Sequence, residues 1–267
     1  MATIEDKLTA EAVSLKPFTH DQAKSALQDH PRQRNISGET IMTGAGPFRI
    51  FWIVAVLFAV SSPAYALEGR DCDTCAGKFD FYVLSLSWSP SFCDMAGDRA
   101  RKQPECGERP YSFVVHGLWP QYENGFPKSC LVPAPRLPRN IMESMLDLMP
   151  APGLVYHEWD EHGTCSGLSP AAYFDTVRRA RAAVKIPSQY IDLKTELRVN
   201  PEDVKNAFIK SNPGLTPSSI AVDCDNRLRE IRICLSKDLT FRDCAKVARR
   251  SCRRDEVIVP PVRGGGT

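Results

Sequence analysis

Ten cysteines lie after residue 71 of this 267-residue chain, and none lies before it. Their number is even, as a complete set of disulfides requires. A zinc site would favour closely spaced pairs of cysteines, and only Cys72 and Cys75 have that spacing. The pattern therefore predicts a disulfide-braced domain that folds in an oxidising compartment. The ten are Cys72, Cys75, Cys93, Cys106, Cys130, Cys165, Cys224, Cys234, Cys244 and Cys252.

The segment before the cysteines has the three parts of a secretory signal peptide. A basic residue precedes the apolar run 50–60, and the small-residue site Ala64-Tyr65-Ala66 follows it. The run has about half of the ~20 residues that a membrane span needs, so a permanent anchor is the weaker interpretation. We expect residues 1–41 to be a mis-assigned or dispensable extension and 42–66 to be the signal peptide. The exported domain is then 67–267, periplasmic or secreted, with no membrane association after cleavage.

The exported part mixes strands and helices. Segments rich in aromatic and branched residues predict strands over 79–87, 111–115, 219–224 and 228–235. Apolar residues at helical spacing predict a helix over 138–149. Ser169-Pro170 and Asn200-Pro201 are typical beginnings of two more helices. Because strands and helices do not alternate strictly, we expect a single α+β domain with a central antiparallel sheet flanked by helices.

Three histidines remain once the leader is removed, and they occupy two short segments. His116 lies in 113–120, and His157 and His162 lie in 157–165. Histidine can both donate and accept a proton near neutral pH. A pair of histidines suits a reaction that needs a base on one side of a phosphorus atom and an acid on the other. The net charge of +2 is too small to indicate a nucleic-acid partner by itself.

The second histidine segment does not have the spacing of a metal site. His157 and His162 are five residues apart, or about 140° around a helix, whereas the zinc-protease pattern needs a spacing of four. In a helix, Glu158 and His162 share a face, and so do His157 and Glu161. We therefore expect neither a metal ion nor a cofactor.

The two histidine segments resemble the two active-site signatures of the ribonuclease T2 family, which are exported ribonucleases with little base specificity. The resemblance covers about residues 75–260. It includes the stretches Ser87-Trp88-Ser89-Pro90, Asn200-Pro201-Glu202-Asp203-Val204, Asn212-Pro213-Gly214-Leu215 and Glu230-Ile231-Arg232-Ile233-Cys234-Leu235. The resemblance implies an endoribonuclease that cleaves single-stranded RNA through attack by the 2′-OH. The product is a 2′,3′-cyclic phosphate, which water then opens to a 3′-phosphate.

The resemblance also implies the roles of individual residues. His162 and His116 are the acid–base pair, which we assign as base and acid respectively. Glu158 assists at the phosphate, and His157 helps to bind it. Trp119 stacks a base. RNA is then the partner of a monomer without stable DNA binding. DNA cannot react, because the 2′-OH is the nucleophile.

The same resemblance implies how eight of the cysteines pair. The expected disulfides are Cys93–Cys106, Cys130–Cys165, Cys224–Cys252 and Cys234–Cys244. Cys72 and Cys75 are left to pair with each other or to stay free.

Two positions depart from the family pattern. Glu161 stands where the family usually has lysine, and Ser87 stands at a glutamine-like position of the second base subsite. We favour a Glu161 side chain that faces solvent or pairs with His157; the alternative is a weakened nuclease that acts as an RNA-binding or toxin-like protein. A second alternative is a thiol–disulfide oxidoreductase built on Cys72 and Cys75. That motif lacks the strand-then-helix context that such enzymes need.

Overall fold

The computed structural model describes residues 76–107 and 109–263, all within the compact unit 65–267. The predicted extension and signal peptide lie outside the described residues, as do Cys72 and Cys75. Among the helices of the described part, none combines the length and the hydropathy of a membrane span.

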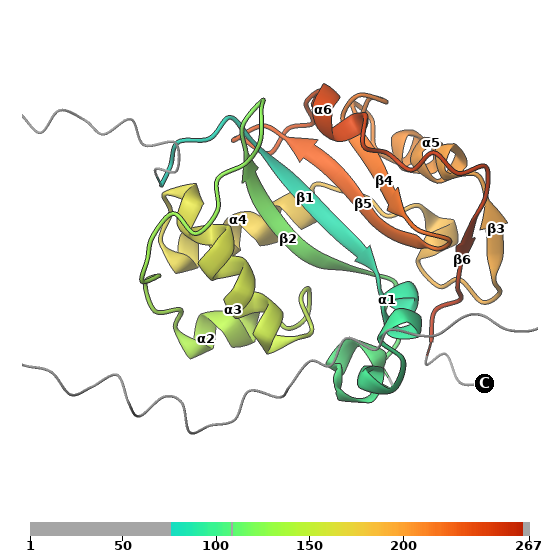
Figure 1. The fold of residues 1–267 in the computed structure, drawn as a ribbon, viewed down its shortest axis with the longest axis horizontal. Coiled ribbons are helices and arrows are strands. Elements are labelled where there is room, and N and C mark those ends of the chain that lie inside the picture. The colour runs from blue at the N-terminus through green and yellow to red at the C-terminus, as the bar shows by residue number, and fades with distance from the viewer. Residues whose placement is uncertain (1–75, 108, 264–267) are drawn as a thin grey trace, which may run out of the picture. The chain divides into compact units, whose positions relative to one another are not determined.

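Four antiparallel strands form the central sheet in the order β2-β1-β5-β4 (Figure 1). They are β1 (Phe81–Trp88), β2 (Phe113–Gln121), β4 (Ile220–Cys224) and β5 (Leu228–Leu235). β1 is buried at almost every position, as a central strand covered on both faces should be. Strands β1, β4 and β5 coincide closely with predicted strands, whereas β2 begins within the predicted strand 111–115 and continues to Gln121. The second sheet was not predicted, and pairs β3 (Leu197–Val199) with β6 (Val257–Val259).

Helices surround the sheet, and α3 and α4 pack against β2 (Figure 1). The α-helices are α1 (Ser89–Ala96), α2 (Arg139–Ser144), α3 (Pro152–Glu161), α4 (Pro170–Ala182), α5 (Pro201–Ser211) and α6 (Ala245–Ala248). Short 3-10 helices are η1 (Gly97–Lys102), η2 (Pro104–Cys106), η3 (Gly163–Ser166) and η4 (Ser188–Tyr190). Both predicted helix caps are confirmed, because the Ser169 and Asn200 side chains accept hydrogen bonds from the first turns of α4 and α5.

The helix predicted over 138–149 is shorter in the structure, where α2 ends at Ser144. Two features explain the difference. Pro150 disfavours the helical conformation of the residue before it. The carbonyl oxygen of Leu148 accepts a hydrogen bond of 2.9 Å from the backbone N–H of Val115 in β2. The last turn is therefore given up for a contact with the sheet.

An aromatic cluster holds the end of the sheet against α5. The Trp88 ring packs edge-on against Phe113 at 4.8 Å, and Phe113 packs against Phe208 of α5 at 5.5 Å. The indole N–H of buried Trp88 donates a hydrogen bond of 3.1 Å to the Pro260 carbonyl. These contacts fix the beginning of β2, the strand that carries the first histidine segment.

Four disulfides brace the part of the chain that the structure describes, and their pairings are those that the family resemblance implies. They are Cys93–Cys106, Cys130–Cys165, Cys224–Cys252 and Cys234–Cys244. Cys130–Cys165 joins the loop before α2 to η3, at the end of the second histidine segment. This disulfide therefore ties the second histidine segment to the loop that follows β2.

Candidate active site

His116 lies at an irregularity of β2. Ser85 of β1 pairs with Gly117, but the next residue, Leu86, pairs with Val115. His116 is therefore the extra residue of a β-bulge, a feature that re-aims a side chain. Its imidazole is 35% exposed and borders a cavity of about 630 Å³.

A buried carboxylate holds one nitrogen of His116. The Nδ1 atom lies 2.6 Å from Oε1 of Glu230, in β5. Glu230 also accepts a hydrogen bond from Ser85 Oγ and two from the guanidinium of Arg232. Arg232 in turn donates to Asp223 at 2.6 Å. The chain Asp223–Arg232–Glu230–His116 therefore orients the imidazole.

The charges of this chain favour a protonated His116. Burial lowers the pKa of His116, but the hydrogen bond and the charge of Glu230 outweigh it, so the pKa is raised above the ordinary value. Burial raises the pKa of Glu230, but His116 and Arg232 outweigh that effect and bring it down to about 2. Because Nδ1 is bound to a carboxylate, the protonated ring leaves Nε2–H to face the site.

Glu158 of α3 meets the same imidazole from the other side. One carboxylate oxygen lies 3.7 Å from Nε2 of His116, and the other accepts a hydrogen bond of 2.8 Å from the Trp119 indole N–H. The side chain is 1% exposed. Burial raises the pKa of Glu158 to about 7. Glu158 can therefore carry or release a proton near neutral pH.

Gly117 makes room for this contact. A Cβ atom at this position would lie 1.9 Å from a carboxylate oxygen of Glu158 and 2.3 Å from Nε1 of Trp119. Any larger residue would push these two side chains away, so glycine lets the helix carboxylate approach the strand.

His162 caps the end of α3 in a less polar setting. Its Nδ1 is buried and has no hydrogen-bond partner among the described residues. Burial lowers the pKa of His162 to about 4. The ring lies 5.5 Å from Trp119, which also packs edge-on against His116 at 5.2 Å. The two histidines thus contact one indole ring and have opposite pKa shifts.

His157 is exposed on α3. Among the described residues it forms no hydrogen bond or ion pair with another side chain, and its charge acts on His162 by lowering the pKa. The structure therefore brings His116, Glu158, His162 and Trp119 together and leaves His157 at the rim.

Glu161 was expected to face solvent or to pair with His157, and it is partly exposed but forms its ion pair with Lys128 instead of His157. The Glu161 carboxylate is 30% exposed and lies 3.6 Å from Nζ of Lys128. Its pKa is lowered, first by a hydrogen bond with Ser129 and further by the charge of Lys128. The backbone N–H of Ser129 also donates to the Glu161 carbonyl at 2.8 Å, so the loop leading to Cys130 sits against the end of α3. This loop supplies the partners that local helix spacing could not reveal.

The sequence did not identify three residues as functional candidates: Glu230, Arg232 and Gly117. Glu230 and Arg232 were interpreted as part of a core strand. Their spacing of two places both on one face of β5, and a charged pair on a buried strand is a signal of a paired, buried polar site. Ser87, the departure at the second base subsite, donates a hydrogen bond of 3.4 Å to Glu230 and lines the His116 cavity.

Within residues 76–107 and 109–263, no group of three or more histidine, cysteine, aspartate or glutamate side chains could hold a metal ion. The site instead combines one histidine held protonated, one held neutral and a carboxyl that titrates near pH 7. This combination is typical of a general acid–base catalyst.

Comparison with known proteins identifies the family of the chain. The profile of the Ribonuclease T2 family matches residues 79–244. The chain belongs to this family.

Its relatives carry ribonuclease names. It is 34% identical over 148 residues to a "Probable ribonuclease" of Haemophilus influenzae, covering 50% of this chain and 54% of the relative. It is 45% identical over 94 residues to a "Ribonuclease" of Aeromonas hydrophila, covering 35% of this chain and 41% of the relative. The match to "Ribonuclease I" of Escherichia coli is 28% identical over 244 residues and covers 71% and 88% of the two chains. The matched region thus spans about half, or less, of the first two relatives' length.

Solved structures support the fold. RNase NT in complex with 5′-AMP has a TM-score of 0.53 and 23% identity, covering 69% of this chain and 99% of the other. Trichomaglin, described as an S-like ribonuclease, has a TM-score of 0.57 and 20% identity over 69% and 99% of the two chains. At this identity the likeness concerns the fold.

Proposed function

We propose that this protein is an endoribonuclease that cleaves single-stranded RNA by attack of the 2′-OH on the adjacent phosphorus. The observation that carries the proposal is the pair of histidines with opposite pKa shifts around Trp119. A neutral histidine can take the proton of the 2′-OH while a protonated one gives a proton to the departing 5′-oxygen.

His162 is the base in this mechanism. Its pKa of about 4 leaves it neutral in mildly acidic and neutral solution. As His162 takes the 2′-OH proton, the 2′-oxygen bonds to phosphorus and the bond from phosphorus to the 5′-oxygen breaks. The product is a 2′,3′-cyclic phosphate.

His116 is the acid. Its raised pKa keeps a proton on Nε2, and the 5′-oxygen takes that proton as it leaves. Glu158 lies 3.7 Å from that nitrogen and, when protonated, can donate a hydrogen bond to a phosphate oxygen. The roles then reverse: His116 takes a proton from water, water opens the ring, and His162 returns its proton to the 2′-oxygen. The products are a 3′-phosphate and the enzyme in its starting state.

The direct test follows end-labelled RNA that contains a single reactive linkage. We expect a 2′,3′-cyclic phosphate first and a 3′-phosphate later, both formed equally well in excess EDTA, because protein groups supply the acid and the base. A 2′-deoxy substitution at the linkage should abolish the reaction. Products with a 5′-phosphate, or activity lost in EDTA and restored by a divalent ion, would rule out this mechanism. RNA binding without turnover would favour the alternative of a catalytically weakened homologue.

Little base specificity is part of the proposal. Trp119 offers a stacking surface, which every base can use, worth about 1–3 kcal/mol. Rates on the sixteen dinucleoside phosphates test this point, and we expect them to vary less than rates of enzymes that read base edges.

We also propose that the domain works after export. Four disulfides support an oxidising compartment, and residues 42–66 have the composition of a signal peptide. Mature protein should begin near Leu67, and N-terminal sequencing of exported material that begins before Met42 would contradict the proposal.

Glu230 is expected to set the alkaline limit of activity. Glu230→Gln removes the charge that raises the pKa of His116, so His116 loses its proton at a lower pH. The alkaline limb of the kcat/KM profile should therefore move to lower pH, while the acid limb, set by His162, stays in place. We expect kcat at the optimum to fall by about tenfold, less than for loss of the histidine itself.

The exposed residue Glu256, which is ion-paired with Arg198, provides the control, because Glu256→Gln removes the same charge from a residue that is not among the groups acting on His116. The pH profile of that variant should match the wild type. If Glu230→Gln lowers kcat without moving the alkaline limb, Glu230 has a structural role and does not hold the proton of His116.

Glu161→Lys is expected to leave the rate unchanged or lower it. The substitution replaces an ion pair by two like charges, because the new ammonium group lies beside that of Lys128. The charge of Glu161 raises the pKa of His162, so its removal lowers that pKa and moves the acid limb to lower pH. Glu161→Gln should cause a smaller shift in the same direction. A clear rate gain for Glu161→Lys between about pH 5 and 7 would instead identify a weakened nuclease.

A further inference from the structure

A groove leads from the catalytic residues to α6. A cavity of about 210 Å³ borders Trp119 and His162, and a second of about 40 Å³ borders Lys246. Four residues line both cavities, which are therefore parts of one groove: Gln121, Phe126, Val247 and Arg250. We call it the α6 groove.

Positive charge is concentrated beside this groove. Residues 242–254 contain six basic residues and one acidic residue, although the whole chain has a net charge of only +2. Lys246 and Arg250 line the groove directly. Neither forms an ion pair with a carboxylate in the part of the chain that the structure describes. Their charge is thus available to a polyanion.

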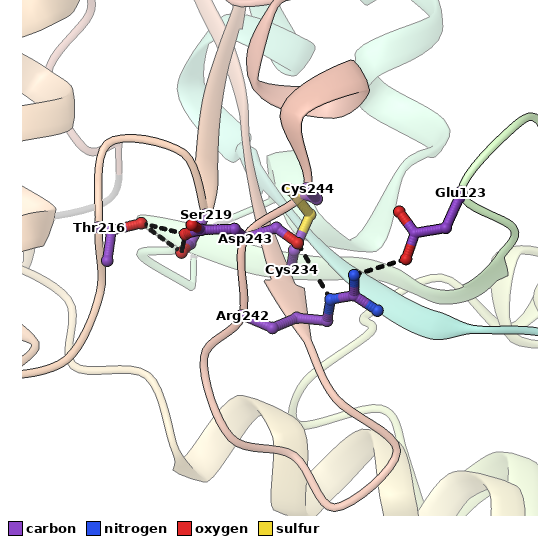
Figure 2. Close-up of a disulfide and its surroundings, with 7 residues drawn as sticks. All are labelled: Glu123, Thr216, Ser219, Cys234, Arg242, Asp243 and Cys244. Carbon is purple, nitrogen blue, oxygen red and sulfur yellow. Dashed lines mark hydrogen bonds and ion pairs between the residues drawn. A yellow bond between two sulfur atoms is a disulfide. The ribbon is translucent and has the colours of Figure 1, made fainter.

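The segment that carries these cations is firmly attached. Figure 2 shows the Cys234–Cys244 disulfide, which joins the start of α6 to β5. Next to it, the Asp243 carboxylate accepts hydrogen bonds from the hydroxyls of Thr216 at 2.6 Å and Ser219 at 3.2 Å. These bonds hold α6 in place, so Lys246 and Arg250 belong to a firmly anchored segment.

The opposite wall of the groove is hydrogen-bonded to the same segment around α6. Arg242 donates a hydrogen bond of 2.6 Å to Glu123, as Figure 2 shows, and Lys246 donates one to Asn124. Glu123 lines the groove, but its charge is paired with Arg242 and repels a phosphate less than a free carboxylate would.

We propose that the α6 groove binds the backbone phosphates of the RNA strand on the 5′ side of the cleaved linkage, with Lys246 and Arg250 as their ligands. The inference rests on the proposed function, because the position of the general base, His162, gives the RNA strand its direction. His162 lies at the groove and takes the proton of the 2′-OH, so the nucleoside that carries this hydroxyl lies there. His116 protonates the leaving nucleoside and borders the other cavity. The strand upstream of the 2′-OH therefore continues toward α6.

The test uses substrates with one reactive uridine, in which every other residue is 2′-O-methylated and cannot react. The shortest substrate is a dinucleotide, and the other two carry four extra nucleotides on the 5′ side or on the 3′ side. In the wild type, the 5′ extension should raise kcat/KM about tenfold at low salt. In Lys246→Gln/Arg250→Gln this gain should vanish, while the gain from the 3′ extension is retained.

Salt dependence gives a second readout. Each phosphate contact with a single strand contributes ~0.7 to the slope of log Kd against log salt. Loss of two contacts in the variant should therefore lower this slope by about 1.4. Fluorescence anisotropy with a fully 2′-O-methylated 5′-extended strand measures this slope without any cleavage. The variant should show the reduced slope, and an unchanged slope would overturn the proposal.

The control is Arg136→Gln/Arg139→Gln, which removes two charges near α2, at the other end of the view in Figure 1 from α6. This variant should keep the full 5′ gain. If it loses the same gain, bulk charge is responsible and the α6 site is refuted. If the wild type cleaves the dinucleotide but gains nothing from the 5′ extension, the α6 site is likewise refuted while the proposed function stands. If the wild type cleaves none of the three substrates, it is the proposed function that fails.

Discussion

His116→Ala and His162→Ala are each expected to lower the rate of RNA cleavage by at least about a hundredfold, as loss of an acid or a base does. The geometry predicts that the two variants differ in their pH profiles. Without His162, the acid limb near pH 4 should disappear, because that limb reports the protonation of the base. Without His116, the alkaline limb should no longer report this histidine but only Glu158, whose pKa rises further once the charge of His116 is gone. Steady-state rates from about pH 3.5 to 9 on a dinucleoside phosphate measure both effects.

His157→Ala is the matched comparison for these two variants. His157 is exposed and is assigned to phosphate binding, so its loss should affect mainly KM. Near wild-type turnover in either His116→Ala or His162→Ala would show that the acid–base assignment is wrong. Interchanged pH limbs would show that the two roles are reversed.

Gly117→Ala should lower the rate almost as much as His116→Ala or His162→Ala, although it adds only one methyl group. The new Cβ would lie 1.9 Å from the Glu158 carboxylate, so that carboxylate and the Trp119 indole must move apart. Overpacking of this kind costs about 1–3 kcal/mol of folding stability. A displacement of about 1 Å in a catalytic site can cost about a hundredfold in rate. We expect a folded protein with lower Tm and kcat reduced to that extent.

Gly107→Ala serves as the control, because a Cβ there meets its nearest neighbour at an ordinary 3.5 Å. Its Tm and kcat should match the wild type. If Gly117→Ala also kept full activity, the contact between Glu158 and Trp119 would not matter for catalysis.

The catalytic candidates could be chosen from the sequence because their signals are local. His116 lies in one short segment and Glu158 and His162 in another, and each segment is recognisable without knowledge of the fold. The strands and helix caps were also predictable, since alternation, branched residues and capping pairs act over a few residues.

The partners of those residues were not predictable, because tertiary structure determines them. Glu230 and His116 are 114 residues apart in sequence and meet through the pairing of β1 with both β2 and β5. Glu161 had a partner available at helical spacing, yet the disulfide-linked loop brings Lys128 and Ser129 closer. The bulge at His116 depends on the register between two strands, which no single segment specifies.

Because of that bulge, the position of His116 depends on the number of residues in β2. Side chains alternate between the faces of a strand, so deleting Val115 or Gly117, on either side of His116, would let β2 pair as a regular ladder and erase the local offset. Composition, hydropathy and strand length would hardly change. Active variants of this protein should therefore tolerate substitutions of many core residues in β2 more readily than deletion of one residue. This should hold even where the fold survives the deletion.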